Sequence, residues 1–467
     1  MNKLKFLSIV VLTFCMTPVL YAGGILTNTN QSAHFIRMLA RDASLQIDAV
    51  YTNPAGLVKL DDGFHFSFSN QSAFQTRTIT STFAPFAGFG GNQEKEYVGK
   101  ASAPIIPSLQ GAYVTGKWVL SGSIAVTGGG GKATFNDGLP SFESTISTLP
   151  VAVSAMGVPT NQYSVDAYMT GSSFIFGGQL GGSYAINDML SAYAGFRLNV
   201  VNNGYEGYLK NIRINPQHPL VNPNGGMMLA TDFLNAAGQS AMAGMVADRE
   251  INNKQSGWGV SPILGFNFNH NDLNIGMKYE FKTGLDVESK TIDGKDGGLE
   301  QFKDGVNTPN DIPALFTIGA QYQITPKLLA SVGYHHFFDS DAKMSGDKQK
   351  FINGGINEYI GGLEYRINKM FLLSAGIQYT KTGVTDDYQA DLSFSLDSYS
   401  IGFGGMVNVS KNVAINIGYF WTTYSDWTKD KAQYASIPGS NPPVFLPGKD
   451  VFSRTNKAFA VGVDFSF

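Results

Sequence analysis

Apolar and polar residues alternate with a period of two along most of the chain from Gly63 onward. Residues 273–281 show the pattern clearly, and residues 312–324 and 411–422 repeat it. Successive side chains of a strand point to opposite faces, so the pattern predicts strands with one apolar and one polar face. A soluble sandwich would also alternate. However, runs of about 10 to 13 residues bordered by aromatic residues are typical of tilted strands that cross a bilayer.

The connections between these runs alternate in length. Short polar turns are predicted at residues 114–117, 186–190, 269–272, 325–327, 366–369 and 409–412. Long connections are predicted at residues 76–104, 136–169, 209–256, 288–311, 342–354, 382–395 and 426–455. This arrangement predicts an all-β fold, a transmembrane antiparallel β-barrel of about fourteen strands with both termini on the periplasmic side.

The first residues have the features of a secretory signal peptide. Lys3 and Lys5 precede an apolar stretch over residues 6–20, and small residues follow, so residues 1–22 are expected to be removed. The only cysteine, Cys15, lies in that stretch, which excludes disulfides and a cysteine nucleophile from the mature chain.

A closed barrel also leaves no unpaired strand edge in lipid. The expected location is the Gram-negative outer membrane.

Composition and charge narrow the functional classes. The chain has 467 residues, 54 of them glycine, and only 15% are charged, against about 25% in an ordinary soluble domain. The formal net charge of −3 gives no basic surface for nucleic acid. A soluble α/β enzyme and a nucleic-acid-binding protein are therefore both disfavoured.

A barrel of about fourteen strands is wide enough to need a plug unless it is an open pore. Residues 23–62 precede the first strand and do not alternate, so they are predicted to form an N-terminal hatch inside the lumen, with a short helix over residues 32–45. The barrel itself is predicted over residues 63–467.

Several motifs resemble a known family. Asp42-Ala43-Ser44, followed by Asn53-Pro54-Ala55-Gly56-Leu57 just before the first strand, resembles the hatch of the FadL long-chain fatty acid transporters, which include the TodX-type hydrocarbon channels. Residues 257–259, 311–313 and 458–467 are similar to other parts of that family, and the similarity covers the mature chain. The resemblance implies capture of an apolar molecule outside the cell, a pocket beside the hatch, and lateral exit through a kinked third strand.

Two motifs are candidates for parts of this route. Asn53, Pro54, Ala55 and Gly56 form an ordinary turn signal when taken alone, but the resemblance implies a hatch anchor. The run of Gly128, Gly129, Gly130 and Gly131 follows an outward-facing set on the third predicted strand, Trp118 to Val126. Such a run is either a flexible strand end or a kink that opens the wall laterally.

Charged and apolar side chains provide further candidates. Arg197, Lys278, Glu280, Lys282, Glu364 and Arg366 are placed towards the lumen by alternation. Most of them are expected to be a paired or solvated lining, and Arg197, Lys278 and Lys282 are candidates for binding a ligand carboxylate. The long connections contain apolar residues that either pack together or bind ligand: Leu149, Val151, Met227, Met228, Phe233, Leu234, Met242 and Met245.

An enzyme is the rival class, but no catalytic or metal-binding spacing emerges. His335 and His336 are adjacent and therefore point to opposite faces of a strand, and His34, His65, His218 and His270 lack metal-ligand spacing. No cofactor is expected. The predicted function is uptake of hydrophobic compounds, and the alternatives are a polar-solute porin and a barrel-embedded lipid-modifying enzyme.

The sequence leaves the cargo open among fatty acids, alkanes, monoaromatic compounds and bile-type amphiphiles. The expected partners are this hydrophobic ligand, outer-membrane lipid and lipopolysaccharide. The outer-membrane assembly machinery is expected to bind the last strand, which ends at Phe467. No nucleic acid is expected, and the chain is predicted to be a monomer.

Overall fold

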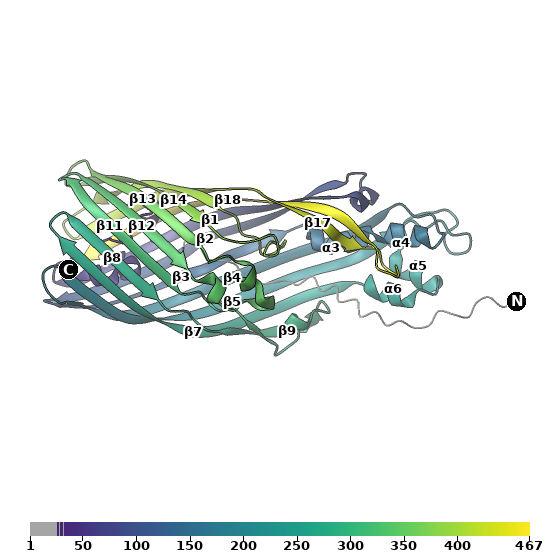
Figure 1. The fold of residues 1–467 in the computed structure, drawn as a ribbon, viewed down its shortest axis with the longest axis horizontal. Helices are drawn as coiled ribbons and strands as arrows, with labels where there is room; N and C mark the ends of the chain where they lie inside the picture. Colours follow the sequence, from purple (N-terminus) through teal and green to yellow (C-terminus); the bar gives the residue numbers. More distant parts are fainter. Residues whose placement is uncertain (1–25, 28, 31) are drawn as a thin grey trace.

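A computed structural model describes residues 26, 27, 29, 30 and 32–467. The predicted signal peptide lies outside the described residues. The chain forms one elongated β-barrel, with short turns and the C-terminus at one end and small helices at the other (Figure 1). No helix in the described part of the chain is long and apolar enough to cross a membrane.

The barrel is a closed antiparallel circuit in which each strand pairs with the next and the last strand pairs with the first. The prediction of about fourteen strands is confirmed. The strands of the circuit are β1 (Gly63–Phe83), β2 (Glu94–Thr115), β3 (Trp118–Phe135), β4 (Tyr163–Ala185), β5 (Leu190–Ile214), β7 (Arg249–His270), β8 (Leu273–Glu280), β11 (Leu315–Thr325), β12 (Leu328–Phe337), β13 (Asn357–Arg366), β14 (Phe371–Lys381), β15 (Ser398–Asn408), β16 (Val413–Tyr424) and β18 (Phe445–Ser466).

The two faces of the wall differ as the alternation predicted. On β3, Trp118, Leu120 and Ile124 are exposed on the outer face, whereas Asn274 and Lys278 of β8 are buried inside. Tyrosines on neighbouring strands line up on the outer face, with ring centroids 5.4 Å apart for Tyr334 and Tyr359. An apolar outer face with aromatic rows is the surface that a barrel presents to lipid.

Several strands are much longer than expected. β4 has 23 residues and β5 has 25, whereas β12 and β13 have 10 each. The predicted long connections at residues 76–104, 136–169, 209–256 and 426–455 are therefore wrong in their bounds, because paired strands occupy much of each. Beyond the bilayer the apolar residues of these strands, such as Ile79 and Phe452, lie on the buried inner face, so the outward apolar alternation ends there while the backbone pairing continues.

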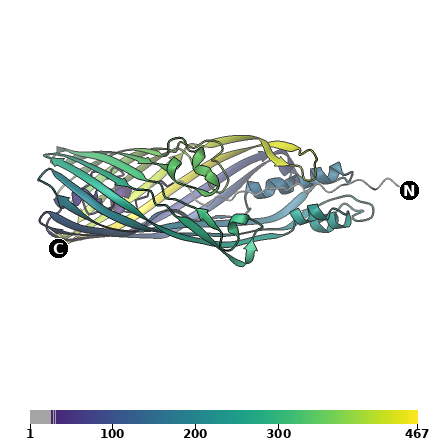
Figure 2. The same ribbon diagram turned by 60° about the horizontal axis from the view of Figure 1, so that its bottom comes forward.

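The outer ends of the long strands carry four short helices (Figure 2). These are α3 (Pro140–Ser147), α4 (Leu149–Ala155), α5 (Ala230–Ala236) and α6 (Ser240–Met245). Of the outer candidates, Leu149, Phe233, Leu234 and Met242 are buried in one apolar cluster, and Met228 packs against it. Val151, Met227 and Met245 are exposed. Most of these apolar residues thus pack the helices against the strands. The strands beside the circuit are β6 (Met228–Leu229), β9 (Asp286–Asp296), β10 (Asn307–Pro309) and β17 (Trp427–Ser436).

The N-terminal segment, residues 32–62, contains α1 (Ala33–Arg37), α2 (Ala49–Thr52) and the 3-10 helix η1 (Pro54–Lys59). Ser32 caps α1, because its side chain accepts a hydrogen bond from the Phe35 amide. The helix predicted over residues 32–45 is wrong in length, since the backbone becomes extended at Met38. An isolated helix this short is marginal, and the irregular stretch after it lies instead against the barrel wall.

Candidate functional site: the seated N-terminal segment, an inner cavity and an interrupted wall

The Asn53-Pro54-Ala55 motif is bonded to three wall strands. Asn53 Nδ2 donates to Asn267 Oδ1 on β7 at 2.7 Å and to the Ser44 carbonyl at 3.1 Å. The Pro54 and Ala55 carbonyls accept from serine hydroxyls on β4 and β5 at 2.7 and 2.6 Å. Gly56 is required because a Cβ there would lie 2.4 Å from Asn53 Nδ2. The motif thus combines a compact turn with outward-directed hydrogen bonds.

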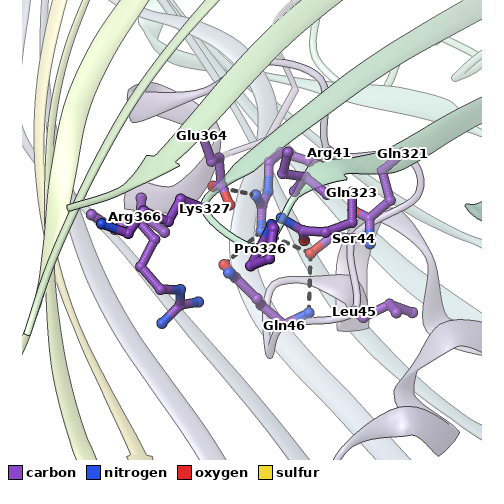
Figure 3. A pocket seen from close by; sticks show the side chains of 12 residues that line it. Arg41, Ser44, Leu45, Gln46, Gln321, Gln323, Pro326, Lys327, Glu364 and Arg366 are labelled. Carbon is purple, nitrogen blue, oxygen red and sulfur yellow. Dashed lines mark hydrogen bonds and ion pairs between the residues drawn. The ribbon is translucent and has the colours of Figure 1, made fainter. Parts of the chain in front are cut away.

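A buried charge network holds the other half of the segment. Arg37 Nη1 lies 2.5 Å from Glu364 Oε1 on β13, and Arg41 Nη1 lies 3.1 Å from the same oxygen. Arg41 also contacts Asp48, Ser44 and Gln46. Figure 3 shows Arg41 and Glu364 at a cavity of about 180 Å³ between the segment and strands β11, β13 and β14. Removing one partner of such a buried network is strongly destabilising.

Rows of glycine make room for the segment on the inner wall. Gly276, Gly319 and Gly333 are directly paired on β8, β11 and β12, and a Cβ at each would lie 2.2 to 2.6 Å from an atom of Asp42. A second row lies under α1 and Leu39, and consists of Gly362, Gly376 and Gly402 on β13, β14 and β15. Here the lack of side chains allows the backbone of the segment to lie directly on the wall.

The predicted carboxylate ligands have partners of their own. Arg197 lies 2.5 Å from Glu280, and its guanidinium is 4.6 Å above the Tyr51 ring. Lys278 Nζ donates to the Tyr51 carbonyl at 2.8 Å. Lys282 is exposed at the end of β8, 3.4 Å from Asp311. Arg197 and Lys278 therefore connect the wall to the segment. Arg366 lines the cavity in Figure 3.

The glycine run lies in β3, where the pairing of the wall is interrupted. β2 and β3 pair up to Ser108/Ala125 and again from Ala101/Ala133, and residues 102–107 and 126–132 between these points do not pair with one another. β3 also shifts register twice against β4, on either side of Gly128. Gly129 and Gly131 have φ values of 97° and 71°, which favour glycine. Gly130 belongs to the same strand. We call this place the wall interruption.

Sequence reasoning missed the other side of the wall interruption, on β2. Pro104 and Pro107 lie there, and proline has no N–H to donate to a neighbouring strand. The freed groups find local partners, since the Ile106 amide donates to Asn70 Oδ1 at 3.2 Å and the Ser72 hydroxyl donates to the Pro104 carbonyl at 2.6 Å. Two prolines three residues apart, at the start of the second predicted strand, were the available signal.

An inner cavity of about 120 Å³ reaches the wall interruption from the lumen. Gly129 and Gly131 line it at β3, and Phe35 and Ile36 line it at α1. The remaining wall is partly apolar, with Ala73, Ala103, Ile106, Phe420 and Ala458, and partly polar, with Gln71, Gln75, Arg454 and Asn456. The cavity therefore lies between the seated segment and the interrupted part of the wall.

A larger outer cavity, of about 610 Å³, lies between α3 and the outer parts of β2, β4 and β5. Phe89, Tyr97 and Tyr208 give it aromatic surface. The Lys95 ammonium lies 4.2 Å from the Phe89 ring centroid and contacts Glu143, whose carboxylate also accepts from Tyr97 at 2.7 Å. The outer cavity is thus amphipathic.

Two histidines pair with carboxylates between the N-terminal segment and the wall. His335 lies between Asp42 and Glu358, at 2.8 and 2.7 Å, and joins the segment to β13. His34 Nε2 lies 3.0 Å from Asp464. In the part of the chain that the structure describes, no group of three or more His, Cys, Asp or Glu is arranged to hold a metal ion.

Comparisons with known proteins identify the fold. No family model and no curated protein matches the chain. Among solved structures, a FadL homologue of Pseudomonas aeruginosa matches with a TM-score of 0.64 at 13% identity, over 95% of this chain and 100% of that chain. The toluene transporter TodX of Pseudomonas putida matches with a TM-score of 0.55 at 16% identity, over 96% and 99% of the two chains.

The toluene transporter TbuX of Ralstonia pickettii is similar at 15% identity, with a TM-score of 0.53 over 94% of this chain and 99% of that one. Two of the three are named as toluene transporters and the third as a FadL homologue, and all three align along almost their full length. The protein therefore has the fold of the FadL- and TodX-type channels, a closed antiparallel β-barrel.

Proposed function

We propose that the protein takes up hydrophobic compounds across the outer membrane, by way of the inner cavity and a lateral exit at the wall interruption. The observation that carries this proposal is that one cavity touches both the seated segment and Gly129 and Gly131 of the interrupted strand. An apolar molecule in that cavity has a short path to lipid and a segment of packed chain between it and the periplasm.

The position of the wall interruption supports exit into the membrane. About ten residues of β3 precede the glycine run, which is about the length that crosses the hydrocarbon layer when tilted. The interruption therefore lies near the outer boundary of that layer. Ile105 and Ile124 are exposed on the outer face beside it, so a cargo that leaves there meets apolar surface.

The size of the inner cavity limits how cargo is held. A cavity of about 150 Å³ in another protein accepts benzene, so 120 Å³ suits one ring or the end of a chain. A longer cargo has to extend towards the wall interruption or the outer cavity. In this proposal the outer cavity receives the cargo first, since it lies at the outer ends of the strands and offers aromatic surface.

A disulfide across the wall interruption tests lateral exit. A Cβ built at Gly131 lies 3.6 Å from the Cβ of Ala103, within the roughly 3.5–4.5 Å that a disulfide spans. The mature chain is expected to have no other cysteine. We expect the double variant Ala103→Cys/Gly131→Cys to take up radiolabelled palmitate slowly when oxidised and at the wild-type rate after reduction, in whole cells whose lipopolysaccharide blocks direct entry.

The matched control is Ala112→Cys/Ser121→Cys, which joins the same two strands where they are paired. Its uptake should not depend on reductant. Equal uptake by the oxidised and reduced forms of the first variant would contradict lateral exit at this place. Swelling of liposomes in sugars, with no uptake of palmitate, would instead favour the polar-solute porin.

A further inference from the structure

Three lysines lie on the outer face of the wall, beside the seam between β18 and β1. Lys457 is on β18, Lys100 on β2 and Lys132 on β3, and all three are exposed. Each stands at the opposite parity to a buried residue of its own strand, namely Ala458, Tyr97 and Phe135. Because successive side chains of a strand point to opposite faces, the three lysines point away from the lumen. We call them the outer lysines.

The outer lysines lie close together in the strand register. Lys457 is opposite Phe74 of β1, and Lys100 is opposite Thr76, two residues further along the same strand. Two interstrand spacings and this shift put the Cα atoms of Lys457 and Lys100 about 12 Å apart. Lys132 lies on the next strand, two residues from the partner of Lys100 and about 8 Å from it. One molecule of the size of a lipid can therefore contact all three.

No carboxylate neutralises the outer lysines in the part of the chain that the structure describes. Lys95 and Lys210, also on the long strands, each form an ion pair with a glutamate, but the outer lysines do not. The nearest outward carboxylates in the register are Glu96 of β2 and Glu206 of β5, about 12 to 14 Å away. Both distances exceed the Debye length of about 8 Å at physiological ionic strength, so salt screens most of the attraction.

Aromatic rings and hydroxyl groups surround the outer lysines. Lys457 is directly opposite two exposed aromatic residues, Phe74 on β1 and Trp421 on β16. Further from the short turns, threonines of β16, β18 and β1 form one register row that ends at Lys100: Thr423, Thr455 and Thr76. The outer face therefore changes at Lys457 from an apolar surface to one with positive charges and hydroxyl groups.

This change of surface coincides with the expected edge of the membrane. Lys457 lies about ten residues from the end of β18 that is beside the short turns (Figure 1), and a tilted strand crosses the hydrocarbon layer in about 9 to 11 residues. Lys132 directly follows the glycine run at the wall interruption, which lies near the same boundary. The outer lysines thus face the head groups of the outer leaflet, whereas Phe74 and Trp421 face its acyl chains.

We propose that the outer lysines bind the phosphate groups of lipopolysaccharide, the phosphorylated glycolipid of the outer leaflet, with its acyl chains against Phe74 and Trp421. The inference rests on the proposed place of the protein in the outer membrane and goes beyond uptake, because this lipid is a partner of the outer face and is not cargo. Lysine is a common phosphate ligand, and threonine hydroxyls can donate to phosphate or sugar oxygens. A lipid without phosphate offers the outer lysines no counter-charge.

The test compares lipid A, the membrane anchor of lipopolysaccharide, with the same lipid after removal of its phosphate groups, so that sugars and acyl chains are identical. Binding to the purified full-length protein is measured by native mass spectrometry in a neutral detergent. EDTA removes divalent cations that would bridge phosphates. One lysine near an anionic membrane surface contributes about fivefold in affinity, so we expect wild type to prefer the phosphorylated form about ten- to hundredfold. The variant Lys100→Gln/Lys132→Gln/Lys457→Gln should lose most of this preference and bind the dephosphorylated form as wild type does.

The matched control removes the same charge at the other end of the barrel. Lys117, Lys369 and Lys411 are exposed at short turns, and the variant Lys117→Gln/Lys369→Gln/Lys411→Gln should keep the wild-type preference. Replacement of all three outer lysines with arginine preserves their charge and should also keep it. Heat-dependent gel mobility checks that each variant is a folded barrel.

Each outcome decides for or against the lipid site. Equal binding of the two lipid forms by wild type overturns it, and so does a full preference in the variant that lacks the outer lysines. An equal loss of preference in both triple glutamine variants also overturns it, since net charge alone would then explain the binding. If inorganic phosphate displaces lipid A at the concentration at which lipid A displaces itself, the outer lysines bind free anions and the lipid proposal fails.

Uptake of palmitate is a separate measurement, which keeps the lipid site and the proposed function distinguishable. A wild-type protein that prefers phosphorylated lipid A, and loses this preference with the outer lysines, supports the lipid site even where palmitate uptake is absent and the proposed function fails.

Discussion

At the scale of single residues, the fit of the N-terminal segment depends on small side chains and buried polar bonds. A Cβ at Gly376 would lie 2.6 Å from the Leu39 backbone nitrogen. Asn53 bonds both to the segment and to β7. Because protein interiors are close-packed, adding or removing one methyl group at such contacts changes the stability. This close packing and the buried hydrogen bonds hold the segment against the wall.

Gly376→Ala tests this fit. The new methyl group meets backbone atoms that cannot move aside easily, so the free energy of unfolding should fall by about 1–3 kcal/mol. We expect a lower thermal transition in heat-dependent gel mobility and a higher single-channel conductance as the segment loosens. Gly361→Ala is the control, because its nearest neighbour would be 3.9 Å away. The same thermal transition and conductance in both variants would argue against close packing of the segment on the wall at Gly376.

A second residue-scale prediction concerns Asp339 in the 3-10 helix η4 (Asp339–Asp341), outside the strands. Burial raises the pKa of its carboxyl to about 7, although the Ile356 amide donates to it at 3.0 Å. The folded-state pKa lies above the unfolded value, so stability is complete at acid pH and is lost as the pH rises towards 7, by at most about 1.4 kcal/mol per pH unit.

Limited proteolysis of the connection between β12 and β13 measures this effect. Each cleavage rate is divided by the rate for an unfolded substrate at the same pH, which corrects for the pH dependence of the protease. The corrected rate for the wild type should be higher at pH 8 than at pH 5. Asp339→Asn removes the ionisation and should give the same relative rate at both values. A wild-type rate that does not change with pH would show that Asp339 does not ionise in this range.

At the scale of elements, β2 and β3 show which features of the site the sequence reveals. The outward set Trp118 to Val126 and the glycine run are local patterns, and both can be recognised before the fold is known. The contacts that hold the N-terminal segment against the wall cannot be recognised in this way, because they join residues far apart in the sequence, such as Asn53 with Asn267 and Arg37 with Glu364. Strand lengths beyond the membrane were likewise hidden, since the outward apolar alternation ends where the apolar residues turn to the inner face.

The prolines of β2 give a prediction at this scale. Replacing Pro104 and Pro107 with valine restores two N–H donors and a residue with high strand propensity. We expect β2 to pair further along β3, which should slow palmitate uptake several-fold and leave the barrel at least as stable. Pro262→Val on β7 is the control, because β5 and β7 pair without interruption there. Unchanged uptake in the double variant would show that the prolines do not maintain the interruption.

At the scale of the whole molecule, closure of the barrel joins its first and last strands. Phe467 and Phe64 exchange two backbone hydrogen bonds, of 2.9 and 3.0 Å, at the end of the seam between β18 and β1. This pairing brings together the most distant parts of the barrel sequence, and such non-local contacts form slowly. Until they form, two strand edges remain unpaired, which lipid does not tolerate.

Phe467 therefore has two separable roles, closing the seam with its backbone and presenting an exposed aromatic side chain. Phe467→Ala keeps the backbone bonds to Phe64 and removes the ring, whereas deletion of Phe467 removes both. If the assembly machinery reads the ring, both variants should reach the outer membrane at several-fold lower levels, and Phe467→Tyr should assemble normally. The measurement is the amount of heat-modifiable barrel in purified outer membranes. Normal assembly of Phe467→Ala with loss only on deletion would assign the effect to seam closure, and normal assembly of the deletion would contradict both roles.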